Sequence, residues 1–372
     1  MLFTEELVKD QQIFLDACRE HGLGERLDIE NYPEVPAFPV YERNRIIAEE
    51  LIQSANHHFS NLPPIHFDFI DSGTINAWAF KHDSRYFIGI TAGAIVMLHL
   101  VIDHMLARQD TFPHIGEPRN ERDVVPVIDW SIIDAKRLYE MGTRPIAARD
   151  TTRLLYGRHL AEQAVMFLIG HEIAHITRGH VDYLASKSGH HFMAELGWND
   201  LSGPLIERQA IEVDADQRSV YARCNSMFMT AESANEQSFP WTVGTVTVEA
   251  LQFDWAFAVN TLFRLFGDEL FSHQDLESSS YPPLPLRRRM AMDFAFQTLL
   301  ENWGKEHEET INTALTSSVG ATELCFNSIG AAPTAGGFSG TSTDDAQRHI
   351  EMLGDSWAAL TENLRQFSYE NI

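Results

Sequence analysis

The stretch Leu168–His180, LIGHEIAHITRGH, constrains this 372-residue chain more than any other part of its sequence. It holds two histidines, His171 and His175, four positions apart. At about 100° per residue, four steps along an α-helix return to nearly the same direction, so both imidazoles lie on one helix face. The apolar run Ala164–Gly170, which leads into the stretch, predicts that this helix is buried. The chain must therefore fold around a core helix that carries two histidines side by side.

Two imidazoles at this spacing suit a metal ion. A catalytic zinc site has three protein ligands and one open position for water. Glu172 lies between the two histidines, where its carboxylate would act as general base beside that water. We predict one Zn²⁺ per chain, because imidazoles and a carboxylate with an open position suit zinc best. The alternative is an ordinary core helix whose histidines are satisfied by hydrogen bonds.

Two glutamates compete for the third metal ligand. Glu195 follows His175 by 20 residues, a thermolysin-like interval, but Asn199 stands where thermolysin-like sequences carry an acid. Glu212 lies in the helical stretch ERQAIEVDADQRSVYA, with Asp216 four residues later on the same face. Glu212 would then bind the metal, while Asp216 hydrogen-bonds a ligand histidine and fixes its tautomer. We favour Glu212, and the alternative for the pair is a solvated acidic face.

Three other polar residues receive simpler interpretations. His180 is turned about 140° away from His175 on a straight helix, so we expect a surface or helix-end histidine. Asp214 lies two steps off the Glu212 face and is expected to be solvated. Cys325 lies in a stretch of small residues that we expect to be flexible, so its thiolate could reach the open metal position. The alternative for Cys325 is a small apolar residue.

The composition limits the possible partners and compartments. With 28 Lys and Arg against 53 Asp and Glu, the formal charge of −25 argues against nucleic acid and anionic membrane surfaces as partners. Three widely spaced cysteines indicate neither a disulfide framework nor a cysteine metal site, and fit a reducing compartment. No signal peptide is evident, and the apolar stretches are too short or too interrupted by acids to span a membrane. We expect a soluble, cytoplasmic protein.

The sequence pattern predicts a mainly helical α+β fold, with a small sheet near the N-terminal side of the metal helix. Three short strands, 64–73, 74–81 and 85–91, are rich in β-branched and aromatic residues. A surface excursion is expected over 108–128, where proline, glycine and mixed charges gather. Helices are predicted over 1–20, 41–59, 92–107, 129–141, 150–186, 204–230, 243–267, 286–314 and 344–367.

Four short segments also follow one another in a recognisable order. They are INAWAF with FIGITAGAI (75–80 and 87–95), HEIAHITRGH (171–180), EVDAD (212–216) and YPPLPLR (281–287). In this order they resemble the HtpX and CAAX-prenyl-protease group of zinc peptidases, with Tyr281 replacing a family histidine. The resemblance implies a zincin-like fold of the gluzincin type, with Glu212 as the third ligand. The HExxH segment is also similar to the phage-exclusion protease Lit, a soluble bacterial zinc peptidase.

The chain departs from that family in two ways, which shape the predicted domains. The family usually has membrane helices, which this sequence lacks, so a soluble relative is expected. The 78-residue interval from Gly93 to His171 is longer than usual, which implies an insertion at about 103–155. The predicted parts are an N-terminal helix and proline-rich connector (1–40), a zinc metallopeptidase domain (41–315), a flexible linker (316–343) and a C-terminal helix (344–372).

The resemblance implies a zinc-dependent endopeptidase acting on a protein or peptide, with a zinc-activated water and Glu172 as general base. Tyr281 and Arg287 are candidates to stabilise the oxyanion, because the family places a histidine and an arginine in their segment. The alternative is that YPPLPLR only begins a helix, with Arg287 pairing a core carboxylate. Two other functions stay open: a non-catalytic zinc-fold interaction protein, and a zinc hydrolase of a non-peptide amide.

The strand TINAWAF suggests how a substrate binds. An exposed strand edge pairs with an extended peptide through main-chain hydrogen bonds. Asn76, Ala77 and Trp78 are therefore predicted to contact substrate, with Asn76 and Trp78 flanking the cleft on alternate sides. The alternative is a buried strand with Trp78 in the core.

Overall fold

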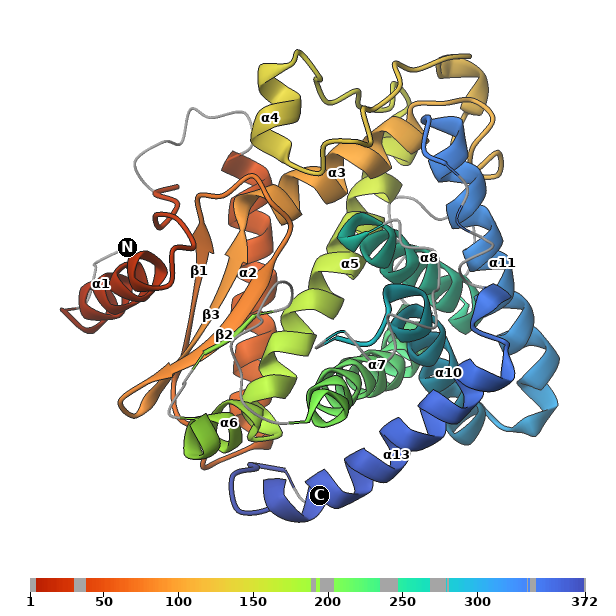
Figure 1. Cartoon of the computed structure of the whole chain (residues 1–372). Coiled ribbons are helices and arrows are strands. Elements are labelled where there is room, and N and C mark those ends of the chain that lie inside the picture. The colour runs from red at the N-terminus through yellow and green to blue at the C-terminus, as the bar shows by residue number, and fades with distance from the viewer. Residues whose placement is uncertain are drawn as a thin grey trace.

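The computed structural model describes residues 5–29, 38–188, 192–194, 204–234, 247–267, 279, 281–332, 334 and 339–370. Helices dominate these residues, and one small sheet, whose first three strands precede the long central helix in the sequence, lies beside that helix (Figure 1). The predicted class, α+β and mainly helical, is confirmed. Among the described helices, none is long and apolar enough to cross a bilayer.

The sheet has the strand order β1-β3-β2-β4. Its strands are β1 (Ile65–Ile70), β2 (Ala77–His82), β3 (Arg85–Thr91) and β4 (Phe192–Ala194). β1 runs parallel to β3, whereas β2 is antiparallel to both β3 and β4. The turn between β2 and β3 contains Asp83 at a φ of 53°, a left-handed conformation that Asp tolerates better than most residues. The first three strands were predicted, but β4 was not.

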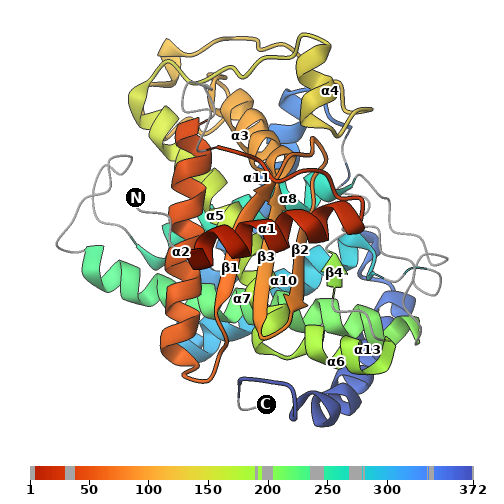
Figure 2. The ribbon, with the colours of Figure 1, turned by 90° about the vertical axis from the view of Figure 1, so that its left-hand side faces the viewer.

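The sheet is covered on both faces. Helix α1 (Glu5–Glu20) crosses one face, as Figure 2 shows, and its Phe14 packs in a cluster with Trp78, Phe80 and Phe87. The alternate residues of β2 point into the main core on the opposite face, where α5 (Thr151–Thr177) packs. The sheet thus separates the N-terminal helix from the helix that carries both histidines.

The other helices surround α5, which runs through the middle of the molecule (Figure 1). Helices α3, α7, α8 and α2 pack against it. Their bounds, with those of the remaining helices, are α2 (Phe38–His58), α3 (Ala92–Leu106), η1 (Pro118–Asn120), α4 (Ala135–Glu140), α6 (His180–Ser188), α7 (Leu205–Ala234), α8 (Val248–Phe266), α10 (Leu284–Trp303), η2 (Lys305–His307), α11 (Glu308–Ser328) and α13 (Asp344–Leu364).

Two predicted helices are each divided at a glycine. The predicted helix 150–186 ends at Thr177, and α6 starts after Gly179, whose φ is +80°. The predicted helix 286–314 is interrupted at Gly304, whose φ is +107°, so α10 and α11 are separate. Positive φ is costly for most residues and ordinary for glycine, so both breaks fall where the chain can turn most easily.

The flexible linker predicted over 316–343 is wrong in its first part. Helix α11 continues to Ser328, and its buried face, which includes Ile311, Leu315, Thr322 and Phe326, lies at helical spacing. Serine, glycine and alanine resemble linker composition, but here small residues let α11 pack closely against α8. Tertiary packing therefore overrides the compositional signal.

One buried arginine holds much of the predicted surface excursion to the core. Arg153, near the start of α5, is fully buried. Its guanidinium donates hydrogen bonds to the carbonyls of Leu106, Arg108, Thr111, Phe112 and Ile115. Five accepted hydrogen bonds satisfy both the buried cation and the irregular backbone around it.

Candidate metal centre

Helices α5 and α7 bring three candidate ligand atoms together. His171 Nε2 lies 2.8 Å from His175 Nε2 and 3.4 Å from Glu212 Oε2. His175 Nε2 lies 3.8 Å from Glu212 Oε1, and all three side chains are buried. The two helices can approach closely because residue 170, next to His171, is a glycine. A Cβ at Gly170 would lie 2.7 Å from Ser219 Oγ on α7.

This donor set fits a metal ion such as zinc. Zinc bonds of about 2.1 Å in tetrahedral geometry place neighbouring donor atoms roughly 3.4 Å apart. The two histidine–glutamate separations are near this value, and the histidine–histidine separation is shorter. His171, His175 and Glu212 form the one group of three such residues in the described ranges whose ligand atoms converge closely enough to hold a metal. Burial and the neighbouring His171 and His180 lower the pKa of His175 well below its usual value, so its imidazole is neutral, as a metal ligand must be.

The outer nitrogen of His171 is held by an acid and an arginine. His171 Nδ1 lies 2.9 Å from Asp216 Oδ1. Arg287, buried at the start of α10, donates to both oxygens of Asp216, at 2.5 and 2.9 Å, and its Nη2 lies 3.7 Å from Glu212 Oε2. A carboxylate accepts hydrogen bonds only, so His171 carries its proton on Nδ1 and turns the lone pair of Nε2 toward Glu212.

The outer nitrogen of His175 faces a second buried histidine. His175 Nδ1 lies 3.0 Å from His180 Nδ1, and His180 Nε2 lies 3.0 Å from Asp214 Oδ2. Asp214 also accepts two hydrogen bonds from Arg178, at 2.7 and 2.8 Å. Burial alone would raise the pKa of Asp214, but His180 and Arg178 hold it well below its usual range.

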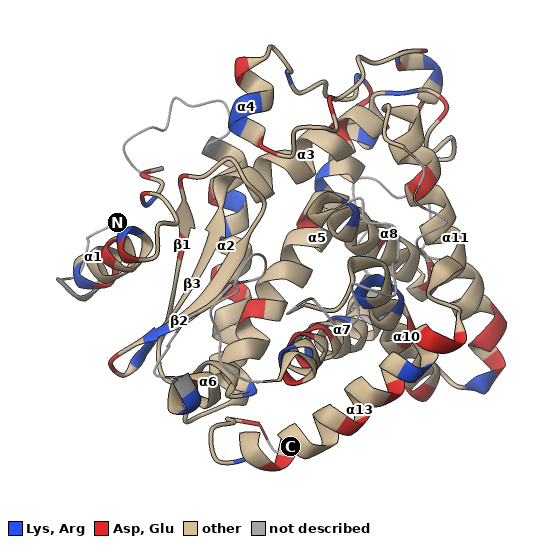
Figure 3. Cartoon of the chain, viewed as in Figure 1, with Lys and Arg blue, Asp and Glu red and all other residues tan. Residues whose placement is uncertain are grey.

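Two sequence expectations are therefore wrong. His180 is fully buried rather than on the surface, because the chain turns at Gly179 and the straight-helix angle no longer applies. Asp214 is 2% exposed rather than solvated, because α13 covers that side of α7. Figure 3 marks several acidic positions along α7, and Glu212, Asp214 and Asp216 among them are buried.

The region that carries the two histidines matches a known protein family. The model of peptidase family M48 matches residues 42–201. This region carries the sequence signature of family M48. The chain is therefore a metallopeptidase, a hydrolase, in agreement with its resemblance to the HtpX and CAAX-prenyl-protease group. No curated protein and no solved structure matches the chain.

The M48 match includes His171, Glu172 and His175 but ends before Glu212. Glu212, the third donor, lies on α7, outside the matched residues, as do Asp216, Arg287 and Trp357, whereas His180 behind His175 lies within them. Glu172 is 1% exposed and adjoins His171 on α5. The competing ligand Glu195 lies outside the described residues, as does Asn199.

The two oxyanion candidates differ in their surroundings. Arg287 is buried, pairs with Asp216 and lies over the ring of Phe263. These contacts are those of the alternative interpretation, in which Arg287 at the start of a helix pairs with a core carboxylate. Tyr281 precedes α10 and is partly exposed, and its backbone amide donates to Ser279 Oγ at 3.2 Å.

The predicted substrate strand, β2, does not have the expected free edge. β4 pairs with β2, with Trp78 opposite Ala194. Trp78 is 5% exposed and packs under α1, as the buried alternative predicted, while Ala77 lies in the main core. The Asn76 side chain accepts a hydrogen bond from the amide of Ala77 at 2.9 Å. The pairing of β4 with β2 was not predicted from the sequence, because β4 is three residues long and lies far from β2 in the sequence.

Cys325 does not reach toward the metal ligands. It is buried in α11, beside Asp110, Arg108 and Arg153, and burial raises the pKa of its thiol to about 12. A neutral thiol inside a helix is neither a flexible ligand nor a nucleophile. The proposed reach to the metal is therefore wrong.

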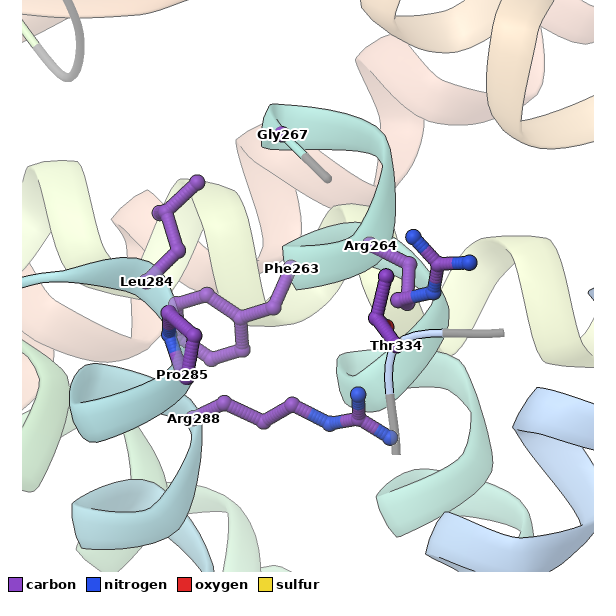
Figure 4. Close-up of a pocket in the computed structure, with 7 residues that line it drawn as sticks. All are labelled: Phe263, Arg264, Gly267, Leu284, Pro285, Arg288 and Thr334. Carbon is purple, nitrogen blue, oxygen red and sulfur yellow. The ribbon is translucent and has the colours of Figure 1, made fainter. Parts of the chain in front are cut away.

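A small pocket lies behind the Phe263 ring that contacts Arg287. Figure 4 shows its lining, formed by Phe263, Arg264, Gly267, Leu284, Pro285, Arg288 and Thr334. Its volume of about 20 Å³ has room for a water molecule but not for a peptide side chain. Arg288 and Arg264 lie 2.8 and 3.3 Å from Glu323, so this wall is a buried ion-pair network behind the site.

Proposed function

We propose that this M48-family chain is a zinc-dependent endopeptidase in which His171, His175 and Glu212 hold the metal. The observation that carries the proposal is the convergence of two imidazole nitrogens and one carboxylate between α5 and α7. Each imidazole is also held from behind by its own buried acid-based network, as metal-binding histidines are. A protein or peptide substrate follows from the family.

When bound there, zinc would lower the pKa of a water molecule and polarise the scissile carbonyl. Glu172 takes a proton from the attacking water and passes it to the leaving amine. Asp216 keeps the proton of His171 on Nδ1, so that Nε2 stays a donor to the metal. Arg287 positions Asp216 through two hydrogen bonds. We propose Tyr281 as the donor that stabilises the oxyanion beside the metal.

The role of Glu172 is tested by the variant Glu172→Gln, which keeps the shape and removes the base. We expect hydrolysis of a denatured protein such as casein to fall about 10²–10⁴-fold, while zinc content stays at the wild-type level. The matched control is Glu162→Gln, a partly exposed glutamate on the same helix that pairs with Arg43. Unchanged hydrolysis in Glu172→Gln would exclude Glu172 as the base.

A further inference from the structure

A chain of hydrogen bonds leads from the metal helix to the C-terminal helix. Its inner part joins His175, His180 and Asp214, as described above. At its outer end, Trp357 of α13 donates its indole N–H to Asp214 Oδ1 at 2.6 Å. Helix α13 packs along α7 and against α6, although its first residue, Asp344, follows the last residue of α5, Thr177, by 167 positions in the sequence (Figure 1).

The positions of the protons in this series of hydrogen bonds follow from Asp214, which can only accept. His180 Nε2 therefore carries a proton, and His180 Nδ1 is left as an acceptor. His175 must then donate from Nδ1, which leaves the lone pair of Nε2 directed at His171 and Glu212. This is the one arrangement in which all three groups are satisfied and His175 is a metal ligand.

The segment that follows α13 holds the turn that places His180. The amide of Tyr369 and the hydroxyl of Ser368 donate to the carbonyl of Thr177, at 2.8 and 3.1 Å. Glu370 accepts from the Thr177 hydroxyl at 2.7 Å and from Arg218 at 2.8 Å. At Gly179 a Cβ would lie 2.6 Å from the backbone of Phe367, so glycine is needed for this contact.

We propose that the C-terminal segment 344–370 is part of the metal centre, with His180 and Trp357 as positioning residues for the ligand His175. Neither residue reaches the metal or the substrate, and both act by fixing the orientation and tautomer of one imidazole. The proposal rests on the proposed function, because it assumes that His175 binds zinc. It extends the centre to an element far outside the residues that match family M48.

The variants Trp357→Phe and His180→Leu test this proposal in the full-length protein. The first keeps an aromatic ring and loses the N–H, and the second loses the acceptor for His175. The readouts are the zinc dissociation constant, from competition with a chromophoric chelator, and the visible absorption spectrum of the Co²⁺-loaded protein. We expect zinc binding to weaken about 10–100-fold in His180→Leu, and at the lower end of this range in Trp357→Phe, with a changed cobalt spectrum in both.

Two further variants separate positioning from general destabilisation. His180→Asn keeps an acceptor near the position of Nδ1 and is expected to bind zinc more tightly than His180→Leu. Trp130→Phe removes another partly buried indole, whose N–H donates to the carbonyl of Ile329 at 3.3 Å, and is expected to match the wild type. Trp130 lies in the chain between α3 and α4, not on α13.

The outcomes distinguish this inference from the function on which it rests. Suppose that the wild type binds zinc, and that Trp357→Phe and His180→Leu have zinc affinities within twofold of the wild type and unchanged cobalt spectra. This result would overturn the inference and leave the proposed function intact. Equal weakening in His180→Asn and His180→Leu would overturn the tautomer argument. A wild-type protein that binds no zinc would overturn both.

Discussion

At the scale of single residues, the two candidate histidine ligands are held in different ways. His171 is backed directly by a carboxylate, Asp216, whereas His175 is backed by His180 and only then by Asp214. The residue types and spacing of HExxH were enough to predict His171, His175 and Glu172 as a group. They could not place His180 or Asp214, because the contacts of these residues depend on a turn at Gly179 and on a helix far along the chain.

Tyr281 provides a test at this scale, since its proposed role differs from that of the buried Arg287. The variant Tyr281→Phe removes one hydroxyl. We expect kcat for casein hydrolysis to fall about 10²-fold with little change in KM, because an oxyanion donor acts in the transition state. Zinc affinity is expected to stay unchanged. The control is Tyr139→Phe, at an exposed tyrosine of α4. Equal activity of Tyr281→Phe and the wild type would remove Tyr281 from the mechanism.

At the scale of elements, the sequence predicts structure well where one pattern dominates and poorly where distant packing decides. The three strands and the helix of the two histidines have strong local patterns, and the structure contains them. β4 is too short for any pattern, and the small residues of α11 resemble a linker until α8 packs against them. At Gly179 and Gly304 the apolar residues of the sequence keep a helical spacing although the helix itself ends, so the pattern predicted one helix where the structure has two.

The close crossing of α5 and α7 gives a prediction about stability. The variant Gly170→Ala places a methyl group 2.7 Å from Ser219 Oγ, and we expect the free energy of unfolding to fall by about 1–3 kcal/mol. Adding Ser219→Ala should recover part of this loss. Gly320→Ala is the control, because its Cβ meets nothing within 4 Å, and it should stabilise α11 by about 0.5–1 kcal/mol. Denaturant unfolding measures the free energy of unfolding of each variant. If Gly170→Ala were as stable as the wild type, the close contact between α5 and α7 at this position would be contradicted.

At the scale of the whole molecule, the candidate centre is assembled from distant parts of the chain. The M48 match supplies α5, but α7 supplies Glu212, α10 supplies Arg287, and α13 supplies Trp357. A metal held between α5 and α7 would therefore stabilise the whole fold. The sequence and its family resemblance predict the three candidate ligands and Asp216 behind His171, whereas the contacts of His180, Asp214 and Trp357 behind His175 required the three-dimensional structure.

Zinc should accordingly raise the stability of the wild-type protein. At free zinc of about 100 times the dissociation constant, the free energy of unfolding should rise by about 2.7 kcal/mol, because zinc binds the folded state. The variant Glu212→Ala should gain much less at the same zinc concentration. Thermal unfolding with zinc and after chelation measures the difference, and an equal gain in both proteins would place the stabilising metal elsewhere.

The most direct test of the central claim is the zinc content per chain of the wild type, Glu212→Ala and Glu195→Ala, measured by elemental analysis after purification with zinc present. We predict about one zinc in the wild type and in Glu195→Ala, and its loss in Glu212→Ala. Loss of zinc in Glu195→Ala alone would assign the third ligand to Glu195. Absence of zinc from all three proteins would contradict the account, and LIGHEIAHITRGH would then be a core helix whose histidines bind no metal.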